Sequence, residues 1–275
     1  RLRDTHIDDW HGGHLIRSLY SYGAKSMEIQ VQYYEALDST NETTVRLARQ
    51  GAPEGTVIVA KEQKNGHGRR QRQWKSPAGG LWFSILLRPK IEPACAAQIT
   101  LLAGVATATA LRQLYQTDRI FIKWPNDLLI GSKKISGILS EMRLSEQGDI
   151  DYIVVGIGVN VNLPAGTFTR ELRDTAVSLN FATGKKFSCN EVLNSILKEM
   201  TALYEPWQRR GAEVILPMWR DLNCTLARDV IVKDEDKIIF AGRAVSISDT
   251  GALEVQNEAG SIRRFDFGEV SIRST

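Results

Sequence analysis

The sequence lacks the features that would assign it at once to several protein classes. No stretch approaches 18 uninterrupted apolar residues, and no basic segment followed by an apolar run stands near its start, so we expect neither a membrane span nor a signal peptide. The Walker phosphate loop, Gly-Lys-Ser/Thr, is also absent. Any nucleotide chemistry must therefore depend on less common motifs.

Cysteine is scarce and poorly spaced for cross-linking. Cys95, Cys189 and Cys224 are odd in number, far apart and outside any Cys-x-x-Cys pattern. This argues against a disulfide framework or a zinc site and favours a reducing compartment. We therefore expect a cytoplasmic protein.

An excess of charge is missing as well. The 35 Lys and Arg residues face 32 Asp and Glu residues, giving a net charge of +3. That is too little for a protein that coats nucleic acid or is drawn to membranes by charge alone. The basic residues are therefore expected to act locally.

The length of 275 residues allows one large core and a smaller second domain, and the sequence pattern divides into three regions. Residues 1–26 are irregular and are interpreted as a leader or linker; their HIDDWHGGH stretch (6–14) gathers histidines and carboxylates without a spacing that fixes metal ligands. Residues 27–222 are expected to form the larger domain. Residues 223–275, with short alternating segments such as DVIVKD, predict a small β-barrel.

Helix and strand signals alternate between residues 27 and 222, which predicts a mixed α+β fold with helices packed on a mixed sheet. Capping-box spacings, Ser39 with Glu42 and Ser188 with Glu191, predict two helix starts. The other expected elements are strands at 27–37, 56–60, 81–87, 119–124, 128–130, 134–142 and 151–162, and helices at 93–116 and 169–180.

The first chemically suggestive stretch is QKNGHGRRQRQW (63–74). Two glycines, Gly66 and Gly68, let the backbone approach a ligand, and Arg69, Arg70 and Arg72 supply forked donors for phosphate or carboxylate oxygens. The third glycine of a dinucleotide fingerprint is missing. Alone, the stretch is equally typical of a solvated basic turn. Trp74, taken alone, is more typical of a core residue than of a ligand contact.

Two further stretches point the same way. In the segment 122–142, Lys123, Asn126, Asp127 and Lys134 would bring ammonium, amide and carboxylate groups to one end of the sheet, as phosphate neutralisation and magnesium binding require. Simple turn chemistry is the alternative for Asn126 and Asp127. In VVGIGVNVN (154–162), glycines within a strand indicate a close backbone approach to a ligand.

Together these stretches resemble the biotin protein ligases over most of the chain, from about Tyr34 to Arg273. The matching segments are DSTN (38–41), Gln63 with the GxGRRxRxW loop, KWPND (123–127), Lys134 with Gly137, GVN (158–160) and GEVSIR (268–273). The resemblance implies the catalytic fold shared with class II aminoacyl-tRNA synthetases, followed by a small SH3-like β-barrel.

The resemblance also implies an activity: ATP-dependent conversion of biotin to biotinyl-5′-AMP, then transfer to a lysine of a biotin carboxyl carrier protein, with Mg²⁺ as cofactor. Arg69 and Lys134 are the implied catalytic residues. The implied biotin contacts are Ser39, Thr40, Gln63, Gly66, Gly68, Arg69, Lys134 and Gly137. The implied ATP or adenylate contacts are Arg69, Arg70, Arg72, Trp74, Lys123, Asn126, Asn160 and Arg273, and the implied metal contact is Asp127.

Two positions depart from the family pattern. His67 stands where the family more often has arginine, which removes a permanent charge. Gln71 stands where it more often has glycine, which questions whether the loop adopts the same turn.

The implied partner is the carrier domain of acetyl-CoA carboxylase or a related carboxylase. We expect no nucleic-acid partner, because the residues before the catalytic segment are too few for the helix-turn-helix of the family's repressor members. We expect no membrane association either. Exposed sheet edges make a homodimer possible.

Three rival functions remain open. A lipoate or octanoate ligase shares the fold and the adenylation chemistry but would not need the polar set of Ser39, Thr40 and Gln63. A basic RNA-binding module would gain little from KWPND. A regulator that binds biotin without catalysis would not need both Arg69 and Lys134.

Overall fold

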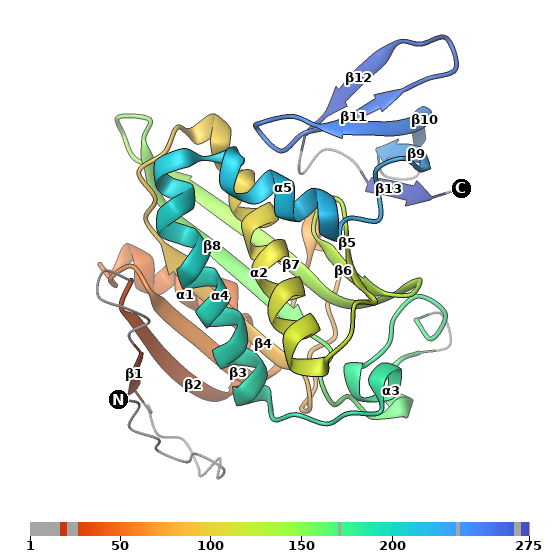
Figure 1. Cartoon of the computed structure of the whole chain (residues 1–275). Helices are drawn as coiled ribbons and strands as arrows, with labels where there is room; N and C mark the ends of the chain where they lie inside the picture. Colours follow the sequence, from red (N-terminus) through yellow and green to blue (C-terminus); the bar gives the residue numbers. More distant parts are fainter. Residues whose placement is uncertain (1–16, 21–26, 170–171, 235–236, 267–270, 275) are drawn as a thin grey trace.

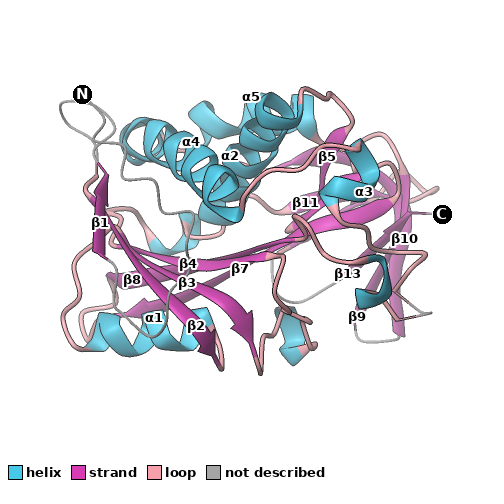
Figure 2. Ribbon diagram, turned by 90° about the horizontal axis from the view of Figure 1, so that it is seen from below, coloured by secondary structure: helices cyan, strands magenta, loops and turns pink. Residues whose placement is uncertain are grey.

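A computed structural model describes residues 17–20, 27–169, 172–234, 237–266 and 271–274. It contains a mixed eight-stranded sheet and a five-stranded C-terminal sheet. Helices α2, α4 and α5 cover one face of the larger sheet, and α1 lies on the opposite face (Figures 1 and 2). The expected α+β class is therefore confirmed. The HIDDWHGGH stretch lies outside the described residues.

The larger sheet is antiparallel except where α1 connects two neighbouring strands, β2 and β3, which run parallel. In spatial order its strands are β1 (Arg17–Tyr20), β2 (Ile29–Leu37), β3 (Thr56–Gln63), β4 (Leu81–Leu87), β8 (Ile150–Val159), β7 (Lys133–Leu144), β6 (Asp127–Ile130) and β5 (Ile120–Lys123). The expectation of an irregular leader is wrong for β1, which pairs with β2 through the backbone. Backbone pairing to an open edge requires no alternating sequence pattern.

The helices are α1 (Thr40–Arg49), α2 (Gln98–Tyr115), α3 (Leu179–Thr183), α4 (Cys189–Arg210) and α5 (Ala212–Leu222), with 3₁₀ turns at Arg69–Gln71, Pro93–Cys95 and Ala165–Thr167. The capping box that starts α4 is present in full. Helix α5 was not predicted, and it contains a proline, Pro217.

The helix expected at 169–180 is wrong. Helix α3 begins only at Leu179, and residues 172–175 form turns. The backbone of Lys134 donates to Thr175 O at 2.8 Å and accepts from Val177 N at 3.0 Å. Pairing with Lys134 therefore holds residues 175–177 out of a helix, against their local sequence preference.

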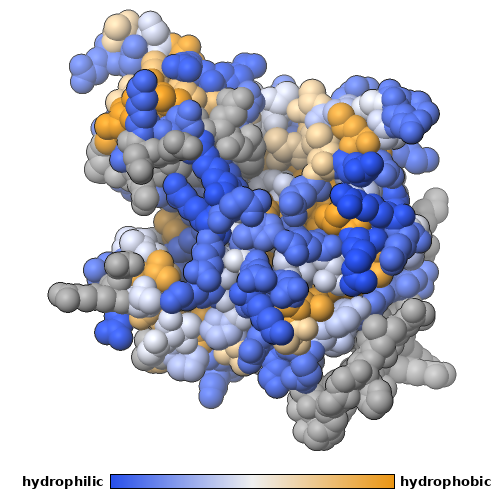
Figure 3. Space-filling model, turned by 180° about the vertical axis from the view of Figure 1, so that it is seen from behind, coloured by the Kyte–Doolittle hydropathy of each residue, from blue (hydrophilic) through white to orange (hydrophobic). Residues whose placement is uncertain are grey.

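Helix α2 is the centre of the hydrophobic core. The segment Pro93–Tyr115 is long and apolar enough to cross a membrane, but 78% of its most apolar window is buried within the protein. Helices α4 and α5 pack against it with buried Trp207 and Trp219. On the opposite side of the molecule, hydrophilic side chains predominate and hydrophobic ones form small separate groups (Figure 3).

The C-terminal strands form a separate antiparallel sheet, so the predicted strands are confirmed and their closure into a barrel stays a prediction. In spatial order they are β12 (Ile262–Phe265), β11 (Leu253–Gln256), β10 (Lys237–Ile247), β9 (Asp229–Asp234) and β13 (Ser271–Ser274). The Trp124 indole donates to Gly251 O at 3.1 Å, and the Gln98 amide donates to Asp249 O at 2.7 Å. These bonds join the C-terminal sheet to the larger domain.

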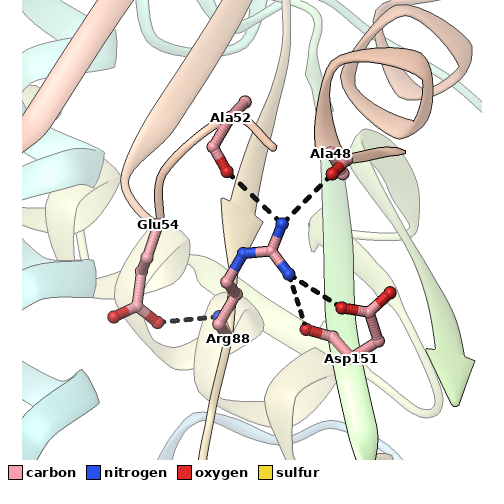
Figure 4. Close-up of polar contacts among 5 residues, drawn as sticks. All are labelled: Ala48, Ala52, Glu54, Arg88 and Asp151. Atoms are coloured by element: carbon pink, nitrogen blue, oxygen red, sulfur yellow. Dashed lines mark hydrogen bonds and ion pairs between the residues drawn. The ribbon is translucent and has the colours of Figure 1, made fainter. Parts of the chain in front are cut away.

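Arg88, just after β4, holds the C-terminal end of α1 (Figure 4). Its guanidinium donates to Ala48 O at 3.2 Å, to Ala52 O at 3.3 Å and to the Asp151 carboxylate at 2.9 Å. Its backbone N–H donates to Glu54 at 2.7 Å. A cation that hydrogen-bonds the last carbonyls of a helix also complements the helix dipole.

The same network predicts a stability contribution from Tyr204, whose hydroxyl donates to Glu54 at 2.5 Å. We expect Tyr204→Phe to lower the free energy of unfolding by about 1–2 kcal/mol, because the bond from a buried hydroxyl to a carboxylate is lost. Urea unfolding measures the change. Tyr34→Phe, which removes a longer 3.2 Å bond to Gln32, is the matched control and should cost about 0.5 kcal/mol or less. Equal losses would contradict this role.

The pH dependence gives a second readout of Tyr204. Burial, followed by the charge and hydrogen bond of Glu54, raises the pKa of Tyr204. Because the folded pKa lies above the unfolded one, this stability is complete below about pH 10 and is lost as the pH rises further. The Tyr204→Phe variant should therefore lose less stability than the wild type above about pH 10.

Candidate active site

A cavity of about 850 Å³ gathers most of the residues that the sequence singled out. Its walls come from the start of α1, the basic loop (residues 66–74), the β5–β6 turn, strands β7 and β8, and the segment 163–176. The predicted residues that line it are Ser39, Thr40, Gln63, Gly68, Arg69, Arg70, Arg72, Trp74, Lys123, Asn126, Asp127, Lys134, Gly137 and Asn160. One cavity thus unites the three stretches.

Neutral polar groups occupy one part of the wall. The backbone N–H of Thr40 donates to Gln63 Oε1 at 2.8 Å, and Gln63 Nε2 donates to Ser76 Oγ at 2.8 Å. Because the backbone N–H can only donate, these contacts fix which end of the Gln63 amide faces α1. The sequence of β3 and α1 therefore builds an oriented set of amide and hydroxyl groups.

Cationic groups occupy another part. Arg69 Nη1 donates to Asn126 Oδ1 at 3.4 Å, and Asn126 Nδ2 donates to Ile138 O at 2.7 Å. Burial lowers the pKa of the Arg69 guanidinium to about 10; the Asp127 carboxylate opposes this shift and Arg70 reinforces it. Arg69 is therefore cationic at neutral pH but poorly solvated, which favours an anionic ligand.

Lys134 stands between a carboxylate and an aromatic ring. Its Nζ lies 2.5 Å from Asp127 Oδ1 and 4.8 Å from the centre of the Trp74 ring. A Cβ on Gly137 would approach Lys134 and Trp74 to within 3.1–3.2 Å, and one on Gly158 would lie 2.8 Å from the Trp74 indole nitrogen. These two glycines therefore make room for the Trp74 and Lys134 side chains.

The basic loop forms a compact turn. Gly68 N donates to Arg72 O at 2.8 Å, and Trp74 N donates to Gly66 O at 2.8 Å. Arg70 and Gln71 both have a φ of 56°, in the left-handed region that glycine adopts most easily. Gln71 thus adopts a glycine-like conformation without being glycine.

Arg70 also connects this loop to the C-terminal sheet. Its Nη2 lies 2.8 Å from Asp234 Oδ1 at the end of β9. The Asp234 side chain is 60% exposed, so the ion pair is partly screened by water. It is nonetheless a direct polar contact between the basic loop and the C-terminal sheet.

Two predicted residues are not placed in the cavity wall. Gly66 lies behind it, where a Cβ would come within 2.7 Å of Ser76 Oγ and Trp74 O. It therefore serves the folding of the loop in this structure. Arg273 lies in β13, and its side chain is outside the described residues.

The possible metal contact can be examined through its ligand chemistry. Asp127 is the one carboxylate among the described residues that line the cavity, and the described part of the chain has no group of three or more His, Cys, Asp or Glu side chains suited to a metal ion. A single carboxylate together with substrate phosphates suits Mg²⁺. The site therefore fits a magnesium ion brought with a nucleotide better than a resident metal.

Several site residues were not recognised from the sequence. The segment 163–176 contributes Phe168, Leu172 and Ala176 to the wall, although no motif marks it. Behind the wall, the fully buried Ser84 contacts Thr40 and Asn41. The available signal was a single hydroxyl within the apolar run LWFSILL.

A helix-covered mixed sheet joined to a small antiparallel sheet is also the arrangement of solved biotin protein ligases. Residues 33–160 match the biotin/lipoate A/B protein ligase family, and residues 225–273 match the biotin protein ligase C-terminal domain. The chain belongs to the biotin/lipoate A/B protein ligase family.

Individual relatives agree with this assignment. The chain is 36% identical over 253 residues to the bifunctional ligase/repressor BirA of Bacillus subtilis, covering 90% of this chain and 76% of the relative. It is 32% identical to the biotin–[acetyl-CoA-carboxylase] ligase of Paracoccus denitrificans, covering 81% and 92%. The solved structure of biotin protein ligase from Aquifex aeolicus in complex with biotin and ATP matches with a TM-score of 0.76 at 32% identity, covering 89% and 99%. The expected family and fold are confirmed.

The contact between Arg70 and Asp234 predicts how the basic loop responds to proteolysis. We expect Asp234→Ala to increase trypsin cleavage after the exposed Arg72 by about two- to fivefold, because an ion pair that holds the basic loop against the C-terminal sheet is lost. Mass spectrometry of limited digests measures the rate. Asp229→Ala, on the same strand but facing Arg243, is the control and should leave cleavage unchanged. Equal effects of both substitutions would refute the connection.

Proposed function

We propose that this chain is an ATP-dependent biotin protein ligase, which activates biotin as biotinyl-5′-AMP and transfers it to a lysine of a carrier protein. The observation that carries the proposal is the division of one cavity into a neutral polar part around Thr40 and Gln63 and a cationic part around Arg69 and Lys134. Biotin combines a neutral cyclic urea with a carboxylate, so its two ends match the two parts.

The family also contains lipoate ligases, and the polar part of the cavity favours biotin over their substrates. A lipoyl or octanoyl chain is apolar and would offer nothing to the remaining hydrogen-bonding capacity of the Thr40 hydroxyl and the Gln63 amide. Covering that capacity with an apolar chain removes it from water without a partner, which gives discrimination against such a ligand. The match of residues 225–273 to the biotin protein ligase C-terminal domain supports the same choice.

In the proposed first step, a biotin carboxylate oxygen attacks the α-phosphorus of ATP, and pyrophosphate leaves with the electrons of the broken bond. The carboxylate is already ionised at neutral pH, so the step needs no general base. It needs two anions held together. Arg69 and Lys134 are positioned to hold them and to stabilise the charge that develops on the phosphoryl oxygens.

The remaining biotin and adenylate roles are assigned to other residues of the wall and to Arg273, whose side chain lies outside the described residues. We propose that Ser39 and Gly68 contact the biotin side, and that Arg70, Arg72, Trp74, Lys123, Asn126, Asn160 and Arg273 serve the adenylate side. Asp127 would hold Mg²⁺, which would neutralise phosphate charge when bound. Gly66 and Gly137 act through the geometry of the loop and of Lys134.

In the proposed second step, a carrier lysine attacks the biotinyl carbonyl, forming an amide as AMP leaves. We propose a biotin carboxyl carrier domain as the partner, residues 27–222 as the catalytic domain and 223–275 as the SH3-like domain. The free thiols of the three cysteines support a cytoplasmic location. A homodimer through a free sheet edge is also part of the proposal.

Pyrophosphate exchange into ATP tests the substrate. We expect exchange with biotin and none with lipoate or octanoate supplied singly. Lys134→Ala should reduce the biotin-dependent rate by about 10²–10³-fold, because a cation at the reacting phosphate is removed. Lys133→Ala is the matched control, since Lys133 points to Arg173 O outside the cavity, and it should retain activity. Exchange driven by lipoate would refute the biotin assignment.

Arg69 should also retain the activated intermediate. We expect Arg69→Gly to release biotinyl-5′-AMP at least about tenfold faster than the wild type, because a charge-assisted bond to the adenylate is lost. Release is measured by chasing labelled adenylate with unlabelled biotin and ATP. Lys64→Gly, near the loop but outside the cavity wall, should release the intermediate at the wild-type rate. An unchanged rate in Arg69→Gly would remove this role.

A further inference from the structure

We propose that Glu141, which does not line the cavity, is a positioning residue that sets the direction of a hydrogen-bond chain ending at Thr40. Asn41 Nδ2 donates to Glu141 Oε2 at 2.6 Å. Ser84 Oγ lies 2.6 Å from Asn41 Oδ1 and 2.7 Å from Thr40 Oγ1. The chain therefore runs from a carboxylate on β7 to a hydroxyl on the cavity wall. The proposal rests on the biotin ligase function proposed above.

The Glu141 carboxylate orients the first group of the chain, the Asn41 amide. An ionised carboxylate only accepts hydrogen bonds, so Asn41 must turn its NH₂ group toward Glu141. The same NH₂ group lies 3.4 Å from Leu139 O, another acceptor. Asn41 Oδ1, which can only accept, therefore faces Ser84. The longer bond to Leu139 O favours the same orientation, and the shorter bond to Glu141 reinforces it.

The orientation of the Asn41 amide then decides where the Ser84 and Thr40 hydroxyl groups donate. Ser84 has one proton and two neighbours, and Asn41 Oδ1 is the neighbour that cannot donate, so the Ser84 proton belongs to that bond. The 2.7 Å bond between Thr40 and Ser84 then requires the Thr40 proton, so the Thr40 hydroxyl donates to Ser84 Oγ. Its proton therefore points into the protein, and Thr40 offers a lone pair to the cavity.

Burial makes this orientation persistent. Ser84 is fully buried, and Thr40 and Asn41 are no more than 5% exposed, so water cannot freely reorient the groups. A Cβ on Gly156 would lie 2.1 Å from Asn41 Oδ1, so the absence of a side chain there is what admits the amide. Asn41, Ser84 and Thr40 thus form a buried, connected part of the chain, and such chains are typically stronger than isolated pairs. Glu141 itself is half-buried.

The consequence is selectivity for a ligand that donates. A cyclic urea presents N–H groups, which a lone pair on Thr40 can accept, whereas a simple acyl chain presents none. Glu141 thus contributes to biotin recognition through Asn41 and Ser84, without touching the ligand. Its role is distinct from that of Arg69 and Lys134, which act on the carboxylate and phosphate.

The test combines Glu141→Gln with Ser84→Ala. A glutamine can accept or donate, so Glu141→Gln weakens the preference of the Asn41 amide for one orientation. Ser84→Ala interrupts the hydrogen-bond chain. Each single substitution should weaken biotin binding, measured by titration calorimetry without ATP, by about five- to tenfold, the value of one net hydrogen bond. The double variant should bind biotin within about twofold of the weaker-binding single variant, because both substitutions interrupt the same hydrogen-bond chain.

The companion measurements separate this role from a general disturbance of the fold. The KM for ATP and the kcat of pyrophosphate exchange should stay within about twofold of the wild type, since the cationic part is unaltered. Glu146→Gln, an exposed glutamate in the β7–β8 turn, is the control and should bind biotin normally. If Ser84→Ala does not fold, Ser84→Cys, which retains the size but donates weakly, replaces it.

The outcomes distinguish the two proposals. Biotin-dependent exchange in the wild type, with normal biotin binding by Glu141→Gln, would overturn the role of Glu141 alone. So would additive losses in the double variant, or an equal rise in the KM for ATP. A wild-type protein without biotin-dependent exchange would instead overturn the proposed function, and with it the selectivity assigned to the chain.

Discussion

The attachment of helix α1 to strand β4 at both ends is the constraint on which the rest of the site depends. Ser84 contacts the first turn of α1, and Arg88, four residues later, hydrogen-bonds the carbonyls at its end. Four residues of strand span about 13 Å, and a ten-residue helix is about 15 Å long. One short segment can therefore hold both ends of the helix. The polar part of the cavity is thereby fixed to the central sheet.

The cationic part of the cavity depends on an imbalance of charge. Among the described residues of the wall, Asp127 is the one acidic side chain, whereas Arg69 and Lys134 belong to a larger group of cations. The pKa of Arg69 is lowered to about 10 despite the nearby carboxylate, so burial outweighs the attraction to Asp127. A bound anion would restore the favourable environment of that charge. The site is preorganised for negative ligands at an energetic cost to its own side chains.

The sequence predicted local features well where local physics decides them. The apolar run at Leu81–Leu87 is a buried strand, and the capping box at Ser188 starts a helix. The helix predicted at 169–180 is wrong, because backbone pairing of residues 175–177 with Lys134 overrides the local preference. The motifs predicted most of the cavity wall, but the hydrogen-bond chain from Glu141 to Thr40 could not be predicted. Its contacts join residues such as Asn41 and Glu141, 100 positions apart, and only the register of the sheet brings them together.

The basic loop shows how a local cost is distributed over the structure. Arg70 and Gln71 are both left-handed, and each such non-glycine residue costs about 1–2 kcal/mol. The exposed ion pair between Arg70 and Asp234 contributes at most about 1 kcal/mol, so it cannot offset that cost alone. The backbone bonds between Gly68 and Arg72 and between Trp74 and Gly66 must supply the difference. The compact turn of the basic loop is therefore only modestly favoured by its own contacts. An anion held by Arg69 would add directly to its stability.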